Sequence, residues 1–118
     1  LNIYKSFENL LENINSDNWM LLYIFWELNL IKELGFDPNL IKYSDEKSDL
    51  SILKDVDIDG ISYTAPNYLI NNILPESYDN NLLKNSLAFT RTILMNKFFV
   101  PNNLIFPKSR VLLENYLN

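Results

Sequence analysis

Glu27 is the residue of this sequence whose position suggests unusual chemistry. It lies in the middle of a long apolar stretch, WMLLYIFWELNLIKELGF, which runs from Trp19 to Phe36. On a helix, the side chains within about 60° of Glu27 are apolar or aromatic, and the opposite side is polar. Those neighbours are Met20, Tyr23, Ile24, Leu30, Ile31 and Leu34. Because a buried carboxylate must be protonated or paired, Glu27 predicts either a structural ion pair or a catalytic acid.

Two arginines are candidate partners for this carboxylate. Arg91 lies on the inner side of a predicted helix, and Arg110 lies in the first turn of the last predicted helix. A planar guanidinium group binds a carboxylate through two hydrogen bonds, so it suits a buried pair better than lysine does. We expect a structural pair, because the sequence offers neither a second catalytic group nor a clear cleft. We therefore predict no catalytic residue.

Composition limits the chemistry further. The chain has 118 residues, 47% of them hydrophobic, and contains neither histidine nor cysteine. A chain of this length can form one small globular domain. The absence of histidine and cysteine excludes the commonest metal ligands and the commonest general base. The apolar stretch carries Glu27, Asn29, Lys32 and Glu33, so it is a poor membrane span. With no visible signal peptide, these features predict a soluble, intracellular protein.

Charge is unevenly distributed along the chain. Residues 1–59 carry twelve acidic and five basic side chains, whereas residues 60–118 carry three acidic and five basic ones. The formal net charge of −5 argues against a free-standing nucleic-acid-binding domain, which usually has a basic excess. The basic second half could still bind a phosphate or an acidic peptide.

The segment DVDIDG, Asp55 to Gly60, matches the opening of a calcium-binding EF-hand loop. The closing position of such a loop requires a bidentate glutamate, but Pro66 stands there. The flanking residues also favour strands rather than helices. We therefore favour a solvated hairpin tip over a calcium site, and expect no metal or cofactor.

Periodicity and turn residues predict a mainly α-helical domain with a short β-hairpin insertion. Gly35 is expected to end the second helix in the left-handed conformation, and Asp59-Gly60 is a strong signal for a two-residue hairpin turn. Residues 37–49 are polar and predict a loop. Helices are predicted at 2–14, 17–34, 66–74, 78–99 and 107–117.

Two blocks of the sequence resemble the C-terminal domain of RecO, a bacterial DNA repair and recombination mediator. The first is the aromatic-Glu-Leu pattern ending in Leu-Gly-aromatic, within Trp19 to Phe36. The second is LAFTRTIL followed by FFVPNNLIFPKSR, from Leu87 to Arg110. Their spacing, with a hairpin between them, is most similar to the alphaproteobacterial members. The resemblance places Arg110 on the arginine of the family and gives Arg91 no counterpart, so it favours Arg110 as the partner of Glu27.

The sequence departs from the family pattern in two respects. Some members bind zinc through four cysteines, but Tyr43 stands at the first of those positions and the chain has no cysteine. The N-terminal OB-fold domain of the family is also absent from this sequence. We therefore expect residues 1–118 to be a RecO-like C-terminal helical domain, the second half of a longer protein without the zinc site.

The resemblance implies a non-enzymatic mediator that supports single-stranded DNA annealing and the loading of RecA, in the cytoplasm at the nucleoid. The implied partners are RecR, single-stranded DNA mainly through the missing domain, and the acidic, apolar C-terminal tail of single-strand-binding protein. Such a tail requires an apolar surface with nearby cations, for which Arg91, Lys97 and Lys108 are candidates. The alternative is an unrelated helical protein-interaction module.

Overall fold

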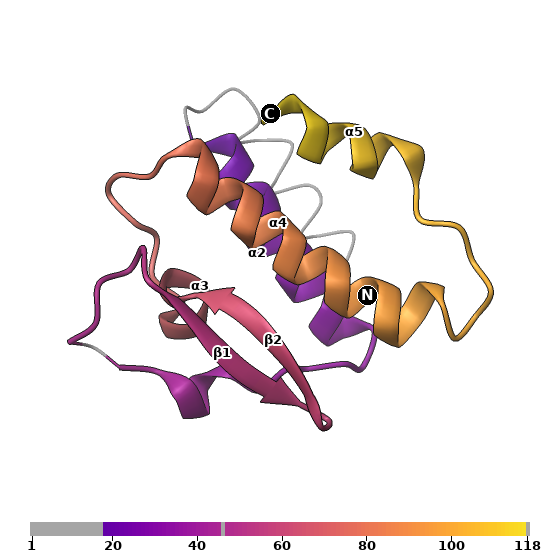
Figure 1. The fold of residues 1–118 in the computed structure, drawn as a ribbon, viewed down its shortest axis with the longest axis horizontal. Coiled ribbons are helices and arrows are strands. Elements are labelled where there is room, and N and C mark those ends of the chain that lie inside the picture. The colour runs from indigo at the N-terminus through magenta and orange to yellow at the C-terminus, as the bar shows by residue number, and fades with distance from the viewer. Residues whose placement is uncertain (1–17, 46, 118) are drawn as a thin grey trace. The chain divides into compact units, whose positions relative to one another are not determined.

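The computed structural model describes residues 18–45 and 47–117 (Figure 1). The chain divides into two compact units, residues 1–38 and 39–118. The described residues contain the helices α2 to α5 and one two-stranded antiparallel sheet, which confirms a mainly helical domain with a β-hairpin. The helix predicted at residues 2–14 lies outside the described residues.

Helix α2 (Trp19–Glu33) is the described element of the first unit and confirms the helix predicted at 17–34. Its polar positions are exposed as expected, including Asn29, Lys32 and Glu33. The fully buried apolar side chains, however, lie on one side of Glu27 around the helix axis, and those on its other side are only partly buried. The first set is Met20, Leu21, Ile24, Leu28 and Ile31, and the second is Tyr23, Leu30 and Leu34. Glu27 is therefore at the margin of the buried face rather than at its centre.

Gly35 ends α2 as predicted. Its φ of 91° is left-handed. The amide of Phe36 donates to the carbonyl of Ile31 at 3.1 Å, and the amide of Gly35 donates to that of Lys32 at 3.0 Å. These two bonds form a Schellman cap, which satisfies carbonyl groups that a helix end otherwise leaves unpaired.

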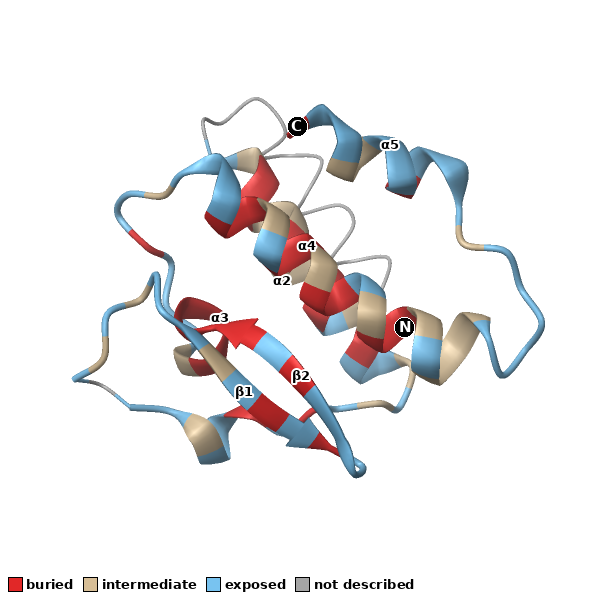
Figure 2. Cartoon of the chain, viewed as in Figure 1, coloured by how far each residue is buried: buried red, intermediate tan, exposed pale blue. Residues whose placement is uncertain are grey.

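The second unit contains the predicted hairpin, with strands β1 (Leu53–Ile58) and β2 (Ile61–Pro66). The turn residues Asp59 and Gly60 have φ values of 54° and 82°, as a two-residue type I′ turn requires. Side chains alternate between the two faces of the sheet. The buried face carries Val56, Ile58, Tyr63 and Ala65, and the exposed face carries Asp55, Asp57, Ser62 and Thr64 (Figure 2).

Two elements differ from the sequence-based expectation. The predicted loop at 37–49 contains a 3₁₀-helix, Leu40–Tyr43, whose Leu40 is buried. The helix predicted at 66–74 is shorter, because α3 (Asn67–Asn71) ends at Asn72, which is left-handed with a φ of 58°. Asparagine tolerates this conformation better than most residues, so it ends the helix before Pro75 does.

The long helix predicted at 78–99 consists of two parts. Helix α4 (Asn80–Leu94) begins after Asp79, whose carboxylate accepts a hydrogen bond from the amide of Leu82 at 2.9 Å. It continues as a π-helical segment, Met95–Phe99. The last helix, α5 (Lys108–Tyr116), confirms the helix predicted at 107–117 and runs back alongside α4 (Figure 1).

A buried chain of hydrogen bonds connects α3 to α4. The hydroxyl oxygens of Tyr68 and Ser86 lie 2.6 Å apart, and Ser86 donates to the carbonyl of Leu82 at 2.7 Å. Because Ser86 has one proton and gives it to that carbonyl, Tyr68 is the donor of the first bond. Burial raises the pKa of Tyr68 to about 12, and the bond to Ser86 opposes this shift in part.

This pKa predicts a loss of stability in alkali. The unfolded tyrosine ionises near pH 10, so the stabilisation is fully present below about pH 10 and is lost as pH rises toward about 12. Denaturant titrations at several pH values should show a fall of roughly 2–3 kcal/mol in the free energy of unfolding over this range. Tyr68→Phe should remove this component of the fall. The same fall in both proteins would contradict the assignment.

Candidate functional site

Arg110 is a buried charged group at the contact between α4 and α5, with only 6% of its surface exposed. Its Nη2 donates to the carbonyl of Leu87 at 2.9 Å and to the Thr90 hydroxyl at 3.3 Å, both on α4. Its Nη1 donates to the carboxylate of Glu114, one turn further along α5, at 3.1 Å. A buried charge is costly unless it is paired and hydrogen-bonded, so these contacts fix how α5 lies on α4.

An aromatic ladder also supports the guanidinium group. The rings of Phe98 and Phe99 pack edge to face with centroids 5.2 Å apart, and Phe99 packs in the same way on Phe106 at 5.1 Å. The guanidinium carbon of Arg110 lies 5.6 Å from the centroid of Phe106, within the range of a cation–π contact. The ladder therefore connects the π-helical segment to the start of α5 across the intervening loop.

Glu114 forms ion pairs with both Arg91 and Arg110, the two arginines that were candidate partners for Glu27. Arg91 Nη1 lies 3.6 Å from Glu114 Oε1, and the Arg91 side chain is 44% exposed. Sequence analysis did not identify Glu114, although its spacing of four residues from Arg110 is the spacing of a helical ion pair. Glu114 therefore lies between the two arginines at the contact between α4 and α5.

Glu27 is buried, as its position in the sequence predicted, with 2% of its surface exposed. The hydroxyl of Tyr23 donates to Glu27 Oε2 at 2.8 Å. Tyr23 is four residues earlier on the same helix, a spacing that could have identified it. The pairing of Glu27 with Arg110 stays a prediction.

The three cations predicted to bind a partner lie in different surroundings. Lys97 Nζ lies 2.6 Å from Asp59 Oδ2 in the hairpin turn. This hydrogen bond lowers the pKa of Asp59 and raises the pKa of Lys97. Arg91 contacts Glu114, and Lys108 is exposed at the first position of α5. A carboxylate of a partner would have to displace Asp59 in order to bind Lys97. It would meet no such competition from Asp59 at Lys108.

The outward face of α5 is apolar next to Lys108. Leu112 and Tyr116 follow Lys108 at intervals of four residues, so the three side chains form one stripe along the helix. Leu112 is 61% exposed and Tyr116 is 75% exposed, and much of α5 is coloured as exposed in Figure 2. Ile105, in the connection before α5, is 93% exposed. We call Lys108, Leu112 and Tyr116 the α5 stripe.

The acidic residues of the EF-hand-like segment have partners within the hairpin or next to it. Asp55 accepts a hydrogen bond from the Thr64 hydroxyl at 3.1 Å, and Asp57 accepts one from the amide of Gly60 at 2.9 Å. Asp59 contacts Lys97. Within residues 18–45 and 47–117, no group of three or more acidic side chains is positioned to hold a metal ion.

One comparison with known proteins gives a match. Residues 2–51 match the family described as Recombination protein O C terminal, which confirms the predicted resemblance over this segment. The match includes α2 and the 3₁₀-helix, and the second block of the resemblance, Leu87 to Arg110, lies beyond it. Neither the curated proteins nor the solved structures give a match. In the described part of the chain, no helix has the length and apolar character needed to cross a membrane.

The predicted pair of Glu27 with Arg110 can be tested by a double-mutant cycle. Glu27→Ala should lower the free energy of unfolding by about 3–5 kcal/mol, because it would leave Glu114 as the one carboxylate paired with this buried cation. Adding Arg110→Met should then cost less than it costs alone, with a coupling of at least about 0.5 kcal/mol. Tyr23→Phe is the control, since it keeps the Glu27 carboxylate and removes the hydroxyl that donates to it, a bond worth roughly 1.5–3 kcal/mol when the acceptor is charged. Strict additivity of the two losses would contradict the pairing.

Proposed function

We propose that this chain acts in DNA repair and homologous recombination as the C-terminal docking domain of a RecO-type mediator. The observation that carries the proposal is the match of residues 2–51 to the C-terminal domain of recombination protein O. That family consists of recombination mediators rather than enzymes. We extend the assignment to residues 1–118 because the second sequence block and the hairpin follow the matched segment in the order that the resemblance implies.

We propose that the chain supports annealing of single-stranded DNA and loading of RecA together with RecR, and that an OB-fold domain outside this sequence makes most contacts with DNA. An excess of acidic side chains in residues 1–59 is consistent with protein contacts rather than DNA contacts for this part.

The α5 stripe is our proposed site for the C-terminal tail of single-strand-binding protein. Such a tail presents carboxylates and apolar side chains together, and the stripe presents an ammonium group beside exposed apolar side chains. Lys108 would bind the carboxylates, and Leu112 and Tyr116 would contact the apolar residues. Arg91, on the adjacent helix and half exposed, is a second cation for the same peptide.

Arg110 supports this site indirectly. Its side chain lies on the buried side of α5, where its bonds to Leu87, Thr90 and Glu114 set the position of the helix. The inward side chains of α5 therefore hold the helix, and the outward ones remain available for a partner. Lys97 adds less to this proposal, because Asp59 already binds its ammonium group.

Fluorescence anisotropy with a labelled peptide of this acidic, apolar tail tests the site. Lys108→Glu should weaken binding about ten-fold, which corresponds to about 1.4 kcal/mol, because it replaces attraction with repulsion. Lys47→Glu makes the same change of charge at another exposed position and should leave the affinity nearly unchanged. Equal affinities for the Lys108→Glu and Lys47→Glu proteins would refute the placement on α5.

A further inference from the structure

The two edges of the hairpin differ in whether their backbone groups have partners. On the β1 edge, the hydroxyl of Tyr43 both donates to the carbonyl of Asp57 at 3.2 Å and accepts from its amide at 3.0 Å. One side chain therefore satisfies both backbone groups of this residue. Lys54 adds a bond to the carbonyl of Tyr43 at 3.3 Å, which keeps the 3₁₀-helix beside this edge. The edge of β1 is closed at this point.

The same contacts identify which backbone groups of β2 face outward. In an antiparallel pair, opposite residues alternate between pairs that exchange hydrogen bonds and pairs whose backbone groups point away from each other. Asp57 uses its amide and carbonyl on Tyr43, so its pair with Ser62 is of the second kind. The pair of Asp55 with Thr64, two residues further, is of the same kind. The amides and carbonyls of Ser62 and Thr64 therefore point away from β1.

Pro66 supports this register. Pro66 is two residues beyond Thr64, so its backbone groups also point away from β1, and it has no amide hydrogen to give to the ladder. Proline is accepted in a strand where its nitrogen faces away from the paired strand. In the described residues the sheet has two strands, and no hydrogen bond to the outward backbone groups of Ser62 or Thr64 is present.

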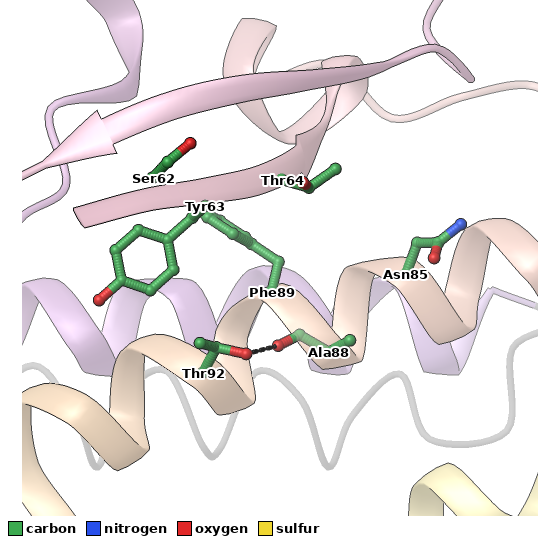
Figure 3. A pocket seen from close by; sticks show the side chains of 7 residues that line it. All are labelled: Ser62, Tyr63, Thr64, Asn85, Ala88, Phe89 and Thr92. Atoms are coloured by element: carbon green, nitrogen blue, oxygen red, sulfur yellow. Dashed lines mark hydrogen bonds between the residues drawn. The ribbon is translucent and has the colours of Figure 1, made fainter.

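A groove lies along this open edge, between β2 and α4 (Figure 3). Its volume is about 240 Å³. It is lined by Ser62, Tyr63 and Thr64 of β2 and by Asn85, Ala88, Phe89 and Thr92 of α4. The hydroxyl of Thr92 donates to the carbonyl of Ala88 at 2.6 Å, so this polar group is already satisfied within the helix. The helical wall therefore combines the small side chains of Ala88 and Thr92 with the ring of Phe89 and the amide of Asn85.

We propose that the free edge of β2 binds an extended segment of a partner protein, which adds to the hairpin as a third strand. The outward amides and carbonyls of Ser62 and Thr64 would form the new ladder, as in other complexes formed by strand addition. An added strand would lie about 4.8 Å from β2, above the groove that Ala88 and Thr92 line. Small apolar side chains suit the side of the segment that faces α4.

Two aspartates indicate which side chains the partner segment carries on the side that faces away from α4. Asp55 and Asp57 are exposed on the outer face of the sheet, and in the described part of the chain neither forms a salt bridge. They lie one strand beyond β2, about 10 Å from an added strand, so the long side chains of lysine or arginine at alternate positions of that strand could extend across β2 toward these negative charges. The predicted occupant is therefore a basic extended peptide, which differs from the acidic tail proposed for α5. Failure of either proposal leaves the other intact.

Proline substitution tests the backbone contacts without removing the hairpin. Thr64→Pro removes one outward amide hydrogen that the β1–β2 ladder does not use, and Thr64→Ala is the matched control because both variants lose the side-chain bond to Asp55. The probe is a fluorescein-labelled peptide of about seven residues in which lysine and valine alternate, long enough to span β2. Circular dichroism and thermal unfolding of both variants check that the fold is retained.

The proposal expects saturable binding of this peptide in an anisotropy titration. Thr64→Pro should weaken binding by at least about ten-fold, whereas Thr64→Ala should remain within about two-fold of the original chain. A peptide in which glutamate replaces lysine should bind at least about ten-fold more weakly. Equal affinity of the two folded variants, equal affinity for the two peptides, or no binding of the lysine peptide would overturn the proposal.

Discussion

The buried guanidinium group of Arg110 requires hydrogen-bond partners, and this requirement determines how α5 lies on α4 in the second unit. Helix α5 has nine residues, from Lys108 to Tyr116, and a helix of this length is marginal in water by itself. Much of its outward surface is exposed and apolar, so burial of that face does not hold it. Arg110 provides a directional attachment instead, because its hydrogen bonds to a carbonyl and a hydroxyl of α4 fix both the position and the rotation of α5.

Helix α4 connects the parts of this unit. Its buried residues are bonded to α3 through Ser86 and to α5 through Leu87 and Thr90. Beyond Leu94 the chain becomes π-helical, and there Asn96 donates to the Tyr63 hydroxyl at 3.0 Å while Lys97 contacts Asp59. Single π-helical turns within α-helices are often found at functional sites. Here the segment contacts the hairpin, whose open edge and groove lie beside the same helix.

The sequence predicted the elements whose signals are local. Gly35 and the Asp59-Gly60 turn were identified because few other residues adopt a positive φ at low cost. Asn72 was missed because asparagine is common in ordinary loops, and only its conformation distinguishes a helix end. The 3₁₀-helix was missed because its stability comes from contacts distant in sequence, such as those of Tyr43 with β1. The burial of Glu27 followed from helical periodicity, but the role of Glu114 depends on how α5 lies on α4, which periodicity does not specify.

Amide hydrogen exchange in the Arg110→Met protein tests most directly whether the guanidinium group holds α5 in place. Methionine keeps much of the apolar stem and removes the hydrogen bonds to Leu87, Thr90 and Glu114. We expect the amides of α5 to lose protection by at least about ten-fold while those of β1 and β2 keep theirs, and we expect Lys108→Met to change neither. Unchanged protection of α5 in the Arg110→Met protein would show that apolar packing, and not the guanidinium group, holds this helix.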